Sequence, residues 1–200
     1  MFGIERECKL KMESRLANMS DLEGVLRLQQ QYHISALSDS ERADGFVTTS
    51  FSRQQLEDLV SREQGLFVAI DGDYVIDYLM TASWDYWSTW RVQAYMASII
   101  DQYSFEGQSI TLQNSYQYGP ICIARAHRGS CLLESLFAFT LNVMSTRYSI
   151  LVTFINILNP RSMNAHVNKL KLKNLGEFEC NGNHHAWLAY STTKQRKHFE

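Results

Sequence analysis

Apolar and polar residues recur with two different periods along the chain, and these periods predict where strands and helices lie. In the first third, we expect a short strand over residues 14–19. Ser20 is expected to be the N-cap of a helix over 22–33, because the acids that follow it complement the helix dipole. After a polar, turn-rich segment, the amphipathic stretch at 53–63 predicts a short second helix.

Two β-hairpins are predicted by apolar runs that flank turn residues. The first spans 65–84 around Gly72, and the second spans 175–191 around Asn181-Gly182, a pair typical of a type I′ turn.

The segment between the first hairpin and residue 113 has mixed patterns. Helical spacing of Val92, Tyr95, Met96 and Ile99 predicts a helix, whereas the alternation at 108–113 leaves a loop or an edge strand open.

A strand, a helix and a second strand are predicted next. The strand at 118–124 opens on Gly119-Pro120, which predicts a bulge or a splayed strand, because proline has no N–H to donate to a neighbouring strand. One apolar helical face covers 132–144, and the continuous apolar run at 149–157 predicts a buried, parallel strand. Asn159 and Pro160 suit the N-cap and first position of a helix through residue 172.

This order of elements predicts an α/β (α+β) fold with a central mixed sheet flanked by helices. We expect a single domain over residues 1–200, with its core at about 14–190 and a frayed tail at 191–200.

Composition narrows the classes of function. The chain has 200 residues, 45% of them apolar, and a formal net charge of −2, which argues against nucleic acid as a partner. No apolar run reaches the about 18 residues that a membrane span requires, and no leader segment is evident, so we expect a cytoplasmic protein. The four cysteines are scattered without a CxxC pair, and we expect reduced thiols.

The segment "HRGSCLL" is the strongest candidate for binding an anion. It lies directly before the helix at 132–144, where unpaired backbone N–H groups can bind phosphate, and Arg128 and Ser130 could add side-chain hydrogen bonds. Neither GxxxxGK nor GxGxxG is present. The alternative is that Gly129 only permits a tight turn between a strand and a helix.

Aromatic residues at the end of the first hairpin are candidates for an acceptor pocket. Trp84, Tyr86 and Trp87, together with Asp85, would suit an amine by desolvation and cation–π contact. Alternatively, these rings cover the sheet or form a homodimer contact. The adjacent histidines 184 and 185 point to opposite faces of a strand, so we expect no metal site.

The hairpin, the strand, the turn at Arg128-Gly129, the helix, the strand and the asparagine-initiated helix together resemble the Gcn5-related N-acetyltransferase (GNAT) family. The resemblance covers Ser14 to Tyr190. It implies a GNAT-like sheet with a splayed pair of parallel strands, and an enzyme that transfers the acetyl group of acetyl-CoA to an amine.

The resemblance also implies which residues contact the cosubstrate. Arg128 matches the family's Arg/Gln position in its pyrophosphate motif, whereas Cys131 and Leu133 occupy positions where the family has small residues. The strand at the splay would hold the pantetheine arm through backbone N–H groups of Ile121 and Ile123, which could also polarise the thioester carbonyl. The residues implied to bind the cosubstrate are Ile121, Cys122, Ile123, Arg128, Gly129, Ser130, Cys131, Leu132, Asn159 and Ser162.

The general acid and base are less evident. Val167 occupies the position of the family's usual acid tyrosine, so the neighbouring His166 and the strand residues Tyr116 and Tyr118 are the candidates. The alternatives are that His166 lies on the helix surface and that the tyrosines only pack.

Three functions remain open from the sequence. The first is an N-acetyltransferase that acts by direct attack of a primary amine, from a small molecule or a peptide, in a ternary complex without a metal. The second is a CoA-binding or interaction module that has lost catalysis, and the third is an unrelated α/β nucleotide-binding protein.

Overall fold

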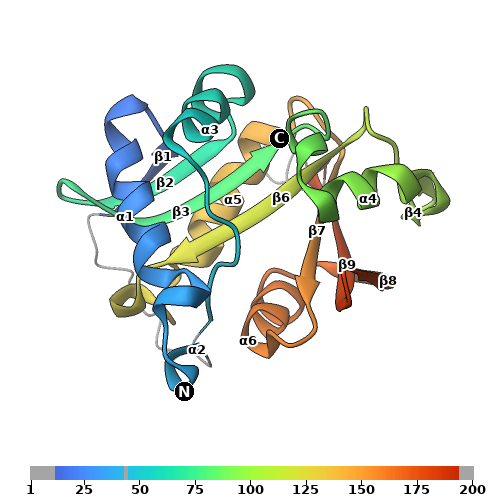
Figure 1. The fold of residues 1–200 in the computed structure, drawn as a ribbon. Coiled ribbons are helices and arrows are strands. Elements are labelled where there is room, and N and C mark those ends of the chain that lie inside the picture. Colours follow the sequence, from blue (N-terminus) through green and yellow to red (C-terminus); the bar gives the residue numbers. More distant parts are fainter. Residues whose placement is uncertain (1–11, 43–44, 194–200) are drawn as a thin grey trace, which may run out of the picture.

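A seven-stranded mixed sheet forms the centre of the computed structural model, which describes residues 12–42 and 45–193 (Figure 1). All neighbouring strands are antiparallel except β6 and β7, which are parallel. In spatial order the strands are β1 (Met12–Leu16), β2 (Leu66–Asp71), β3 (Tyr74–Ala82), β6 (Ser115–Ile123), β7 (Ile150–Asn156), β9 (Asn183–Ser191) and β8 (Lys173–Cys180).

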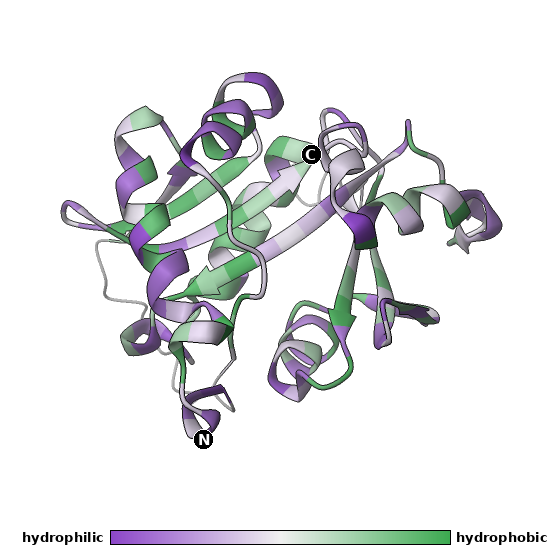
Figure 2. Cartoon of the chain, viewed as in Figure 1, coloured by the Kyte–Doolittle hydropathy of each residue, from purple (hydrophilic) through white to green (hydrophobic). Residues whose placement is uncertain are grey.

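Helices cover both faces of this sheet. On one face, apolar residues of α1 and α3 pack on β2 and β3, and α4 covers β7 and β9. On the other face, α5 packs against the central strands. Figure 2 shows apolar residues concentrated on the central strands and on α5. The helices are α1 (Leu22–Tyr32), α2 (Asp39–Arg42), α3 (Arg53–Asp58), α4 (Arg91–Ile99), α5 (Leu132–Met144) and α6 (Pro160–Met163).

Several shorter elements complete the described part of the chain. Wider, π-type turns extend α3 over Leu59–Glu63 and α6 over Asn164–Lys169. A separate two-stranded ribbon pairs β4 (Ser104–Phe105) with β5 (Gln108–Ser109). Short 3-10 turns lie at Met19–Asp21, Ile34–Ala36, Tyr86–Thr89, Ile100–Gln102 and Arg125–His127.

The parallel strands β6 and β7 diverge soon after they meet. Only three residue pairs join them, and the last is Gln117 with Val152. On its other side, β6 pairs with β3, but the register shifts where Gly119-Pro120 lies opposite Met80. The predicted bulge and splay are therefore confirmed, and the gap between the two strands opens toward the lower side of Figure 1.

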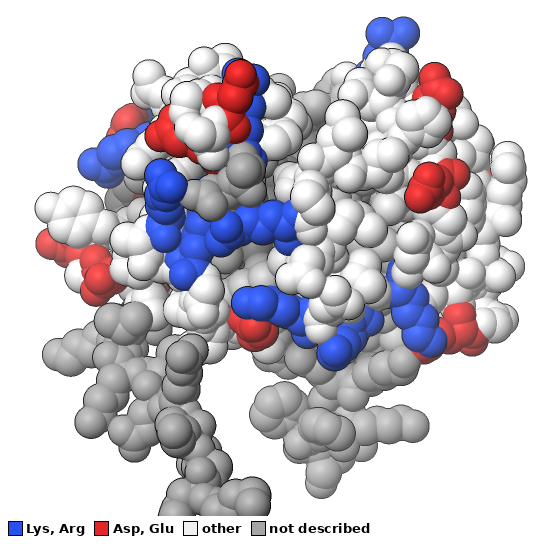
Figure 3. All heavy atoms as spheres, turned by 90° about the horizontal axis from the view of Figure 1, so that it is seen from below, with Lys and Arg blue, Asp and Glu red and all other residues white. Residues whose placement is uncertain are grey.

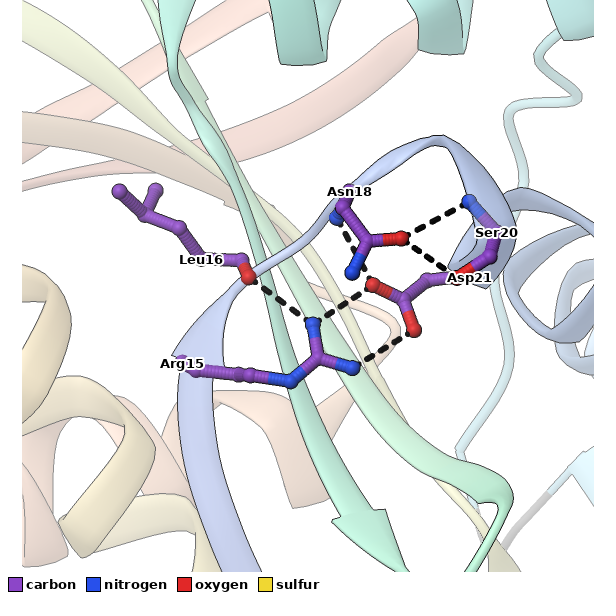
Figure 4. A network of polar contacts seen from close by, with 5 residues as sticks. All are labelled: Arg15, Leu16, Asn18, Ser20 and Asp21. Atoms are coloured by element: carbon purple, nitrogen blue, oxygen red, sulfur yellow. Dashed lines mark hydrogen bonds and ion pairs between the residues drawn. The ribbon is translucent and has the colours of Figure 1, made fainter.

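An ion pair fixes the connection between β1 and α1 (Figure 4). The Arg15 guanidinium donates to both carboxylate oxygens of Asp21, at 2.7 and 2.9 Å, and the Asn18 N–H donates to the same carboxylate. Burial alone would raise the pKa of Asp21, but the bonds from Arg15 and Asn18 hold it below its usual range. The expected N-cap Ser20 lies inside a 3-10 turn that precedes the helix. Asn18 caps this turn, since its side chain accepts from the Ser20 N–H, and Asp21 holds the N-cap position of α1.

Other expectations need correction in detail. The first strand ends at Leu16, before the expected limit of 19, and the alternation at 108–113 contributes only the two residues of β5. Cys122 and Cys180 are free thiols as expected, whereas Cys131 is disulfide-bonded, so the expectation of a reduced thiol is wrong there. Most of the expected frayed tail, residues 194–200, lies outside the described residues.

Candidate active site

Two adjoining cavities lie in and below the gap between β6 and β7. One, of about 180 Å³, is lined by the splayed part of β6 and by β7; the other, of about 300 Å³, reaches the turn that precedes α5. They form one continuous slot because they share six lining residues: Phe46, Val47, Ile121, Asn159, Ser162 and His166.

The end of the slot at α5 is basic. Arg128, Arg161 and Lys169 line it, and none of the other described residues that line it is acidic. Figure 3 looks at the molecule from below and shows Lys and Arg side chains gathered across the middle of this face. Arg128 is held in place, because its Nε donates to the Ile123 carbonyl at 2.9 Å and its guanidinium lies over the Tyr32 ring. This end of the slot suits a phosphorylated ligand.

The turn itself presents backbone donors. Gly129 has a φ of 83°, in the left-handed region, and nothing lies within 4 Å of where a Cβ would stand. The N–H groups of Gly129 and Ser130 have no acceptor among the described residues, and they lie at the N-terminal end of the 13-residue helix α5. Such groups bind anions favourably. Cys131 has a φ of −78°, so its side chain adds no backbone strain.

Backbone N–H groups of β6 face the gap as well. N–H groups point alternately to the two sides of a strand. Because Ala124 donates to Ile76 of β3, the N–H groups of Ile121 and Ile123 must point away from β3, toward β7. The ladder to β7 has ended by then, so these two groups are available to a ligand in the slot.

Asn159 and Ser162 line both cavities, but part of their hydrogen-bonding capacity is used within the helix. Asn159 is the N-cap of α6, and its Oδ1 accepts from the Ser162 N–H at 3.0 Å. The predicted cap is confirmed. The cap fixes the start of the helix that carries His166.

His166 lies where the two cavities meet. It is 4% exposed, so the alternative that it is a surface residue is wrong. Nδ1 lies 2.8 Å from the Ser162 carbonyl and must donate to it, which leaves Nε2 as an acceptor. Nε2 has no partner among the described residues and is not sealed from the cavity. Burial lowers the pKa of His166, so the ring is a neutral base at pH 7.

The two tyrosines differ in position. Tyr118 lines the cavity, and its ring lies 5.7 Å from the His166 ring in an edge-to-face contact. Tyr116 packs near Tyr148 and lines neither cavity. Burial raises the pKa of both hydroxyls. Catalytic roles for His166, Tyr118 and Tyr116 stay predictions.

The remaining predicted residues fall into two groups. Ile121, Cys122, Ile123, Arg128, Gly129 and Ser130 line the basic cavity. Cys131 and Leu132 do not line either cavity; Cys131 is exposed, and Leu132 packs with Ala69 and Ile76 under the turn.

The aromatic group at the end of the first hairpin lies apart from the slot. Trp84 and Trp87 are buried in the core, Tyr86 stacks on Trp90, and Asp85 is exposed. The rings therefore cover the sheet within this chain, and none of these side chains lines the two cavities.

Sequence reasoning missed Gln93 and His185, which line the cavity on the side away from Arg128. The buried face of α4 contains Gln93 and Met96 and continues into Ile100 of the next 3-10 turn. It is turned from the predicted stripe of Val92, Tyr95, Met96 and Ile99. A glutamine in register with buried apolar residues was the available signal.

The arrangement of strands and helices is similar to that of solved acetyltransferases. The chain is similar to a GNAT superfamily phosphinothricin acetyltransferase from Sinorhizobium meliloti in complex with AcCoA, with a TM-score of 0.60 and 15% identity over 91% of this chain and 89% of that one. The chain has the GNAT acetyltransferase fold. No family model and no curated protein matches the sequence.

Two further GNAT-fold neighbours are similar over most of their length. One is the protein yncA of Salmonella typhimurium, solved with its cofactor acetyl-CoA (TM-score 0.59, 12% identity, 90% of this chain and 94% of that one). The other is the ribosomal-protein-S18-alanine N-acetyltransferase of Escherichia coli (TM-score 0.58, 8% identity, 90% and 94%). At these identities the likeness is one of fold.

In the part of the chain that the structure describes, no group of three or more His, Cys, Asp or Glu side chains could hold a metal ion. The helices described for residues 12–42 and 45–193 are all too short or too polar to cross a membrane.

Proposed function

We propose that the protein transfers the acetyl group of acetyl-CoA to a primary amine by direct attack within a ternary complex. The observation that carries this proposal is the continuous slot, which joins a basic turn, an opened strand pair and a neutral, buried histidine. GNAT-fold neighbours solved with acetyl-CoA give it further support.

The chain's own groups fit this cosubstrate. Arg128 and the N–H groups of Gly129 and Ser130 bind the pyrophosphate, next to the other basic side chains of this end of the slot. The N–H groups of Ile121 and Ile123 bind the pantetheine arm, and one of them polarises the thioester carbonyl, which favours attack by a nucleophile.

His166 moves the proton in the chemical step. Its Nε2 accepts a proton from the amine as the new C–N bond forms, and the lowered pKa of the ring makes the imidazolium a good acid. When the C–S bond breaks, the same nitrogen returns the proton to the departing thiolate. His166 thus takes the role of the tyrosine whose position Val167 occupies. The edge-to-face contact with Tyr118 holds the orientation of the His166 ring.

A CoA-binding module without catalysis is the second candidate, since Cys131 and Val167 depart from the family's motifs. The backbone at Cys131 has a helical φ, so this departure leaves the turn unstrained. Both functions require CoA binding, so the test must also measure acetyl transfer to an amine.

The experiment combines calorimetric titration of acetyl-CoA with thiol release in the presence of an amine panel. We expect binding, amine-dependent thiol release, and a fall in kcat of about 10²-fold or more in His166→Gln at unchanged acetyl-CoA affinity. The exposed His184→Gln in β9 is the matched control. Binding without release for any amine would favour the module, and absence of binding at millimolar ligand would exclude both.

A further inference from the structure

The two ends of the slot differ sharply in charge. Among the residues that the structure describes, three cationic side chains line the end at α5, whereas no Asp, Glu, Lys or Arg lines the cavity on the β6–β7 side. If the basic end holds the phosphates, the uncharged end faces the thioester from the opposite direction. The acceptor must enter there.

Gln93 is the most informative side chain of this uncharged end. It lies on the buried face of α4, is 6% exposed, and lines the cavity. Neither its Oε1 nor its Nε2 has a hydrogen-bond partner among the described residues, and neither is sealed from the cavity. The Gln93 amide therefore presents both polar atoms to the cavity, where they are free to pair with a ligand.

The other polar groups of this end are also neutral. His185 is 5% exposed and stacked on Phe178, and burial lowers its pKa, so it is uncharged at pH 7. Gln117 is 2% exposed and donates to the Tyr118 carbonyl, while its Oε1 has no partner. The side chains of His185 and Gln117 are therefore neutral and supply no counter-charge to a ligand beside Gln93.

We propose that the acceptor is a primary amine whose neighbouring group is an uncharged amide, and that Gln93 recognises this amide. The proposal rests on the function proposed above. A carboxamide offers one acceptor and two donors, which the Gln93 amide can pair with directly. A second ammonium group or a carboxylate would enter a buried site without an opposite charge, and would lose its hydration uncompensated.

Three small amines that share the H₂N–CH₂ unit test this proposal: glycinamide, glycine and ethane-1,2-diamine. They carry a neutral amide, a carboxylate and an ammonium group in the same place. We expect glycinamide to have a kcat/KM at least about tenfold above the other two, each rate being divided by the unprotonated fraction of the reacting amine. Equal rates, or a preference for either charged amine, would overturn the proposal.

A substitution at Gln93 makes the test specific. Gln93→Glu adds a carboxylate of nearly the same shape, so the preference should shift at least about tenfold from glycinamide toward the diamine. Gln102→Glu, at an exposed glutamine beyond the same helix, should leave the preference unchanged. If Gln93→Glu shifts the preference no more than this control does, Gln93 does not contact the acceptor.

A binding measurement separates the failure of this proposal from the failure of the enzymatic one. The CoA-loaded protein is titrated with glycinamide while the NMR signals of the Gln93 side-chain amide are followed. Saturable shifts without acetyl transfer would support the acceptor site and contradict the enzymatic function. Acetyl transfer to other amines without such shifts would contradict the acceptor site alone.

Discussion

Asp77 on β3 is a carboxylic acid that is fully buried in the sheet. No side chain among the described residues bonds its carboxyl oxygens, and burial raises its pKa well above the ordinary value, against a smaller lowering by the Tyr78 backbone N–H. Its ionisable neighbours Tyr78, Tyr118 and Cys122 have raised pKa values too, mainly through burial. In the folded protein Asp77 therefore keeps its proton to a higher pH than an exposed carboxyl group does.

This protonation predicts a pH-dependent effect of Asp77→Asn. Below pH 3.8 the folded and unfolded states both keep the proton. Above it, only the folded state does, so the free energy of unfolding of the wild type falls by up to about 1.4 kcal/mol per pH unit until the folded pKa is reached. Asparagine cannot ionise, and the variant should gain stability relative to the wild type as the pH rises.

Urea denaturation of both proteins at pH 5 and pH 7 measures this difference. The exposed Asp73→Asn, in the same hairpin, controls for loss of a carboxylate. A difference between Asp77→Asn and the wild type that is equal at both pH values would mean that Asp77 ionises in the fold.

Individual site residues could be predicted from sequence where the backbone provides the function. Arg128 and Gly129 were identified because a tight turn before a helix favours a glycine, and because a cationic side chain there can bind the same anion as the helix N-terminus. His166 was identified by its position next to Val167, but its burial was not, because burial depends on how the helix packs against β6. Gln93 was missed because its role depends on tertiary packing alone.

At the scale of elements, the splay between β6 and β7 depends on one side chain that bridges it. The Thr153 hydroxyl donates to the Tyr118 carbonyl at 2.7 Å, just beyond the last residue pair of the parallel ladder. The Gln117 amide donates to the same carbonyl. Side chains thus satisfy a backbone group that the bulge at Gly119-Pro120 leaves without its strand partner.

Thr153→Val removes this hydroxyl at nearly constant shape. We expect the free energy of unfolding to fall by about 1 kcal/mol, the usual net contribution of one hydrogen bond, because the Tyr118 carbonyl keeps only the Gln117 amide. Thr153→Ser retains the hydroxyl and should recover most of the loss. The measurement is equilibrium denaturation in urea, and a valine variant as stable as the wild type would show that the bond does not support the splay.

Elements with a strong local signal were predictable. The two hairpins, α5 and the bulge at Gly119-Pro120 each follow from residues within the element. In contrast, the alternation at 108–113 corresponds to a strand of only two residues, β5. This strand pairs with the equally short β4 and not with the main sheet. The buried face of α4 was predicted incorrectly, because this helix packs on β7 and β9 and not on β3, the strand that precedes it in the sequence.

At the scale of the whole molecule, the sheet consists of two parts that diverge at the ligand slot. The first part, from β1 to β6, carries the basic turn, and the second part, from β7 to β8, carries His166. The parts are joined by the short parallel ladder of β6 and β7. A ligand in the slot contacts both parts, and its binding should therefore stabilise the whole sheet.

Hydrogen exchange with and without CoA tests this coupling. At a ligand concentration 100 times Kd, all amides that exchange through global unfolding should be protected by about 2.7 kcal/mol. The N–H groups of Ile121 and Ile123 should gain additional local protection, because the ligand supplies the acceptors that β7 does not. Ala124 is the internal control, since its N–H already donates to Ile76 at 2.8 Å. Uniform protection of all three amides would contradict binding of the pantetheine arm along β6, and unchanged exchange would contradict binding in the slot.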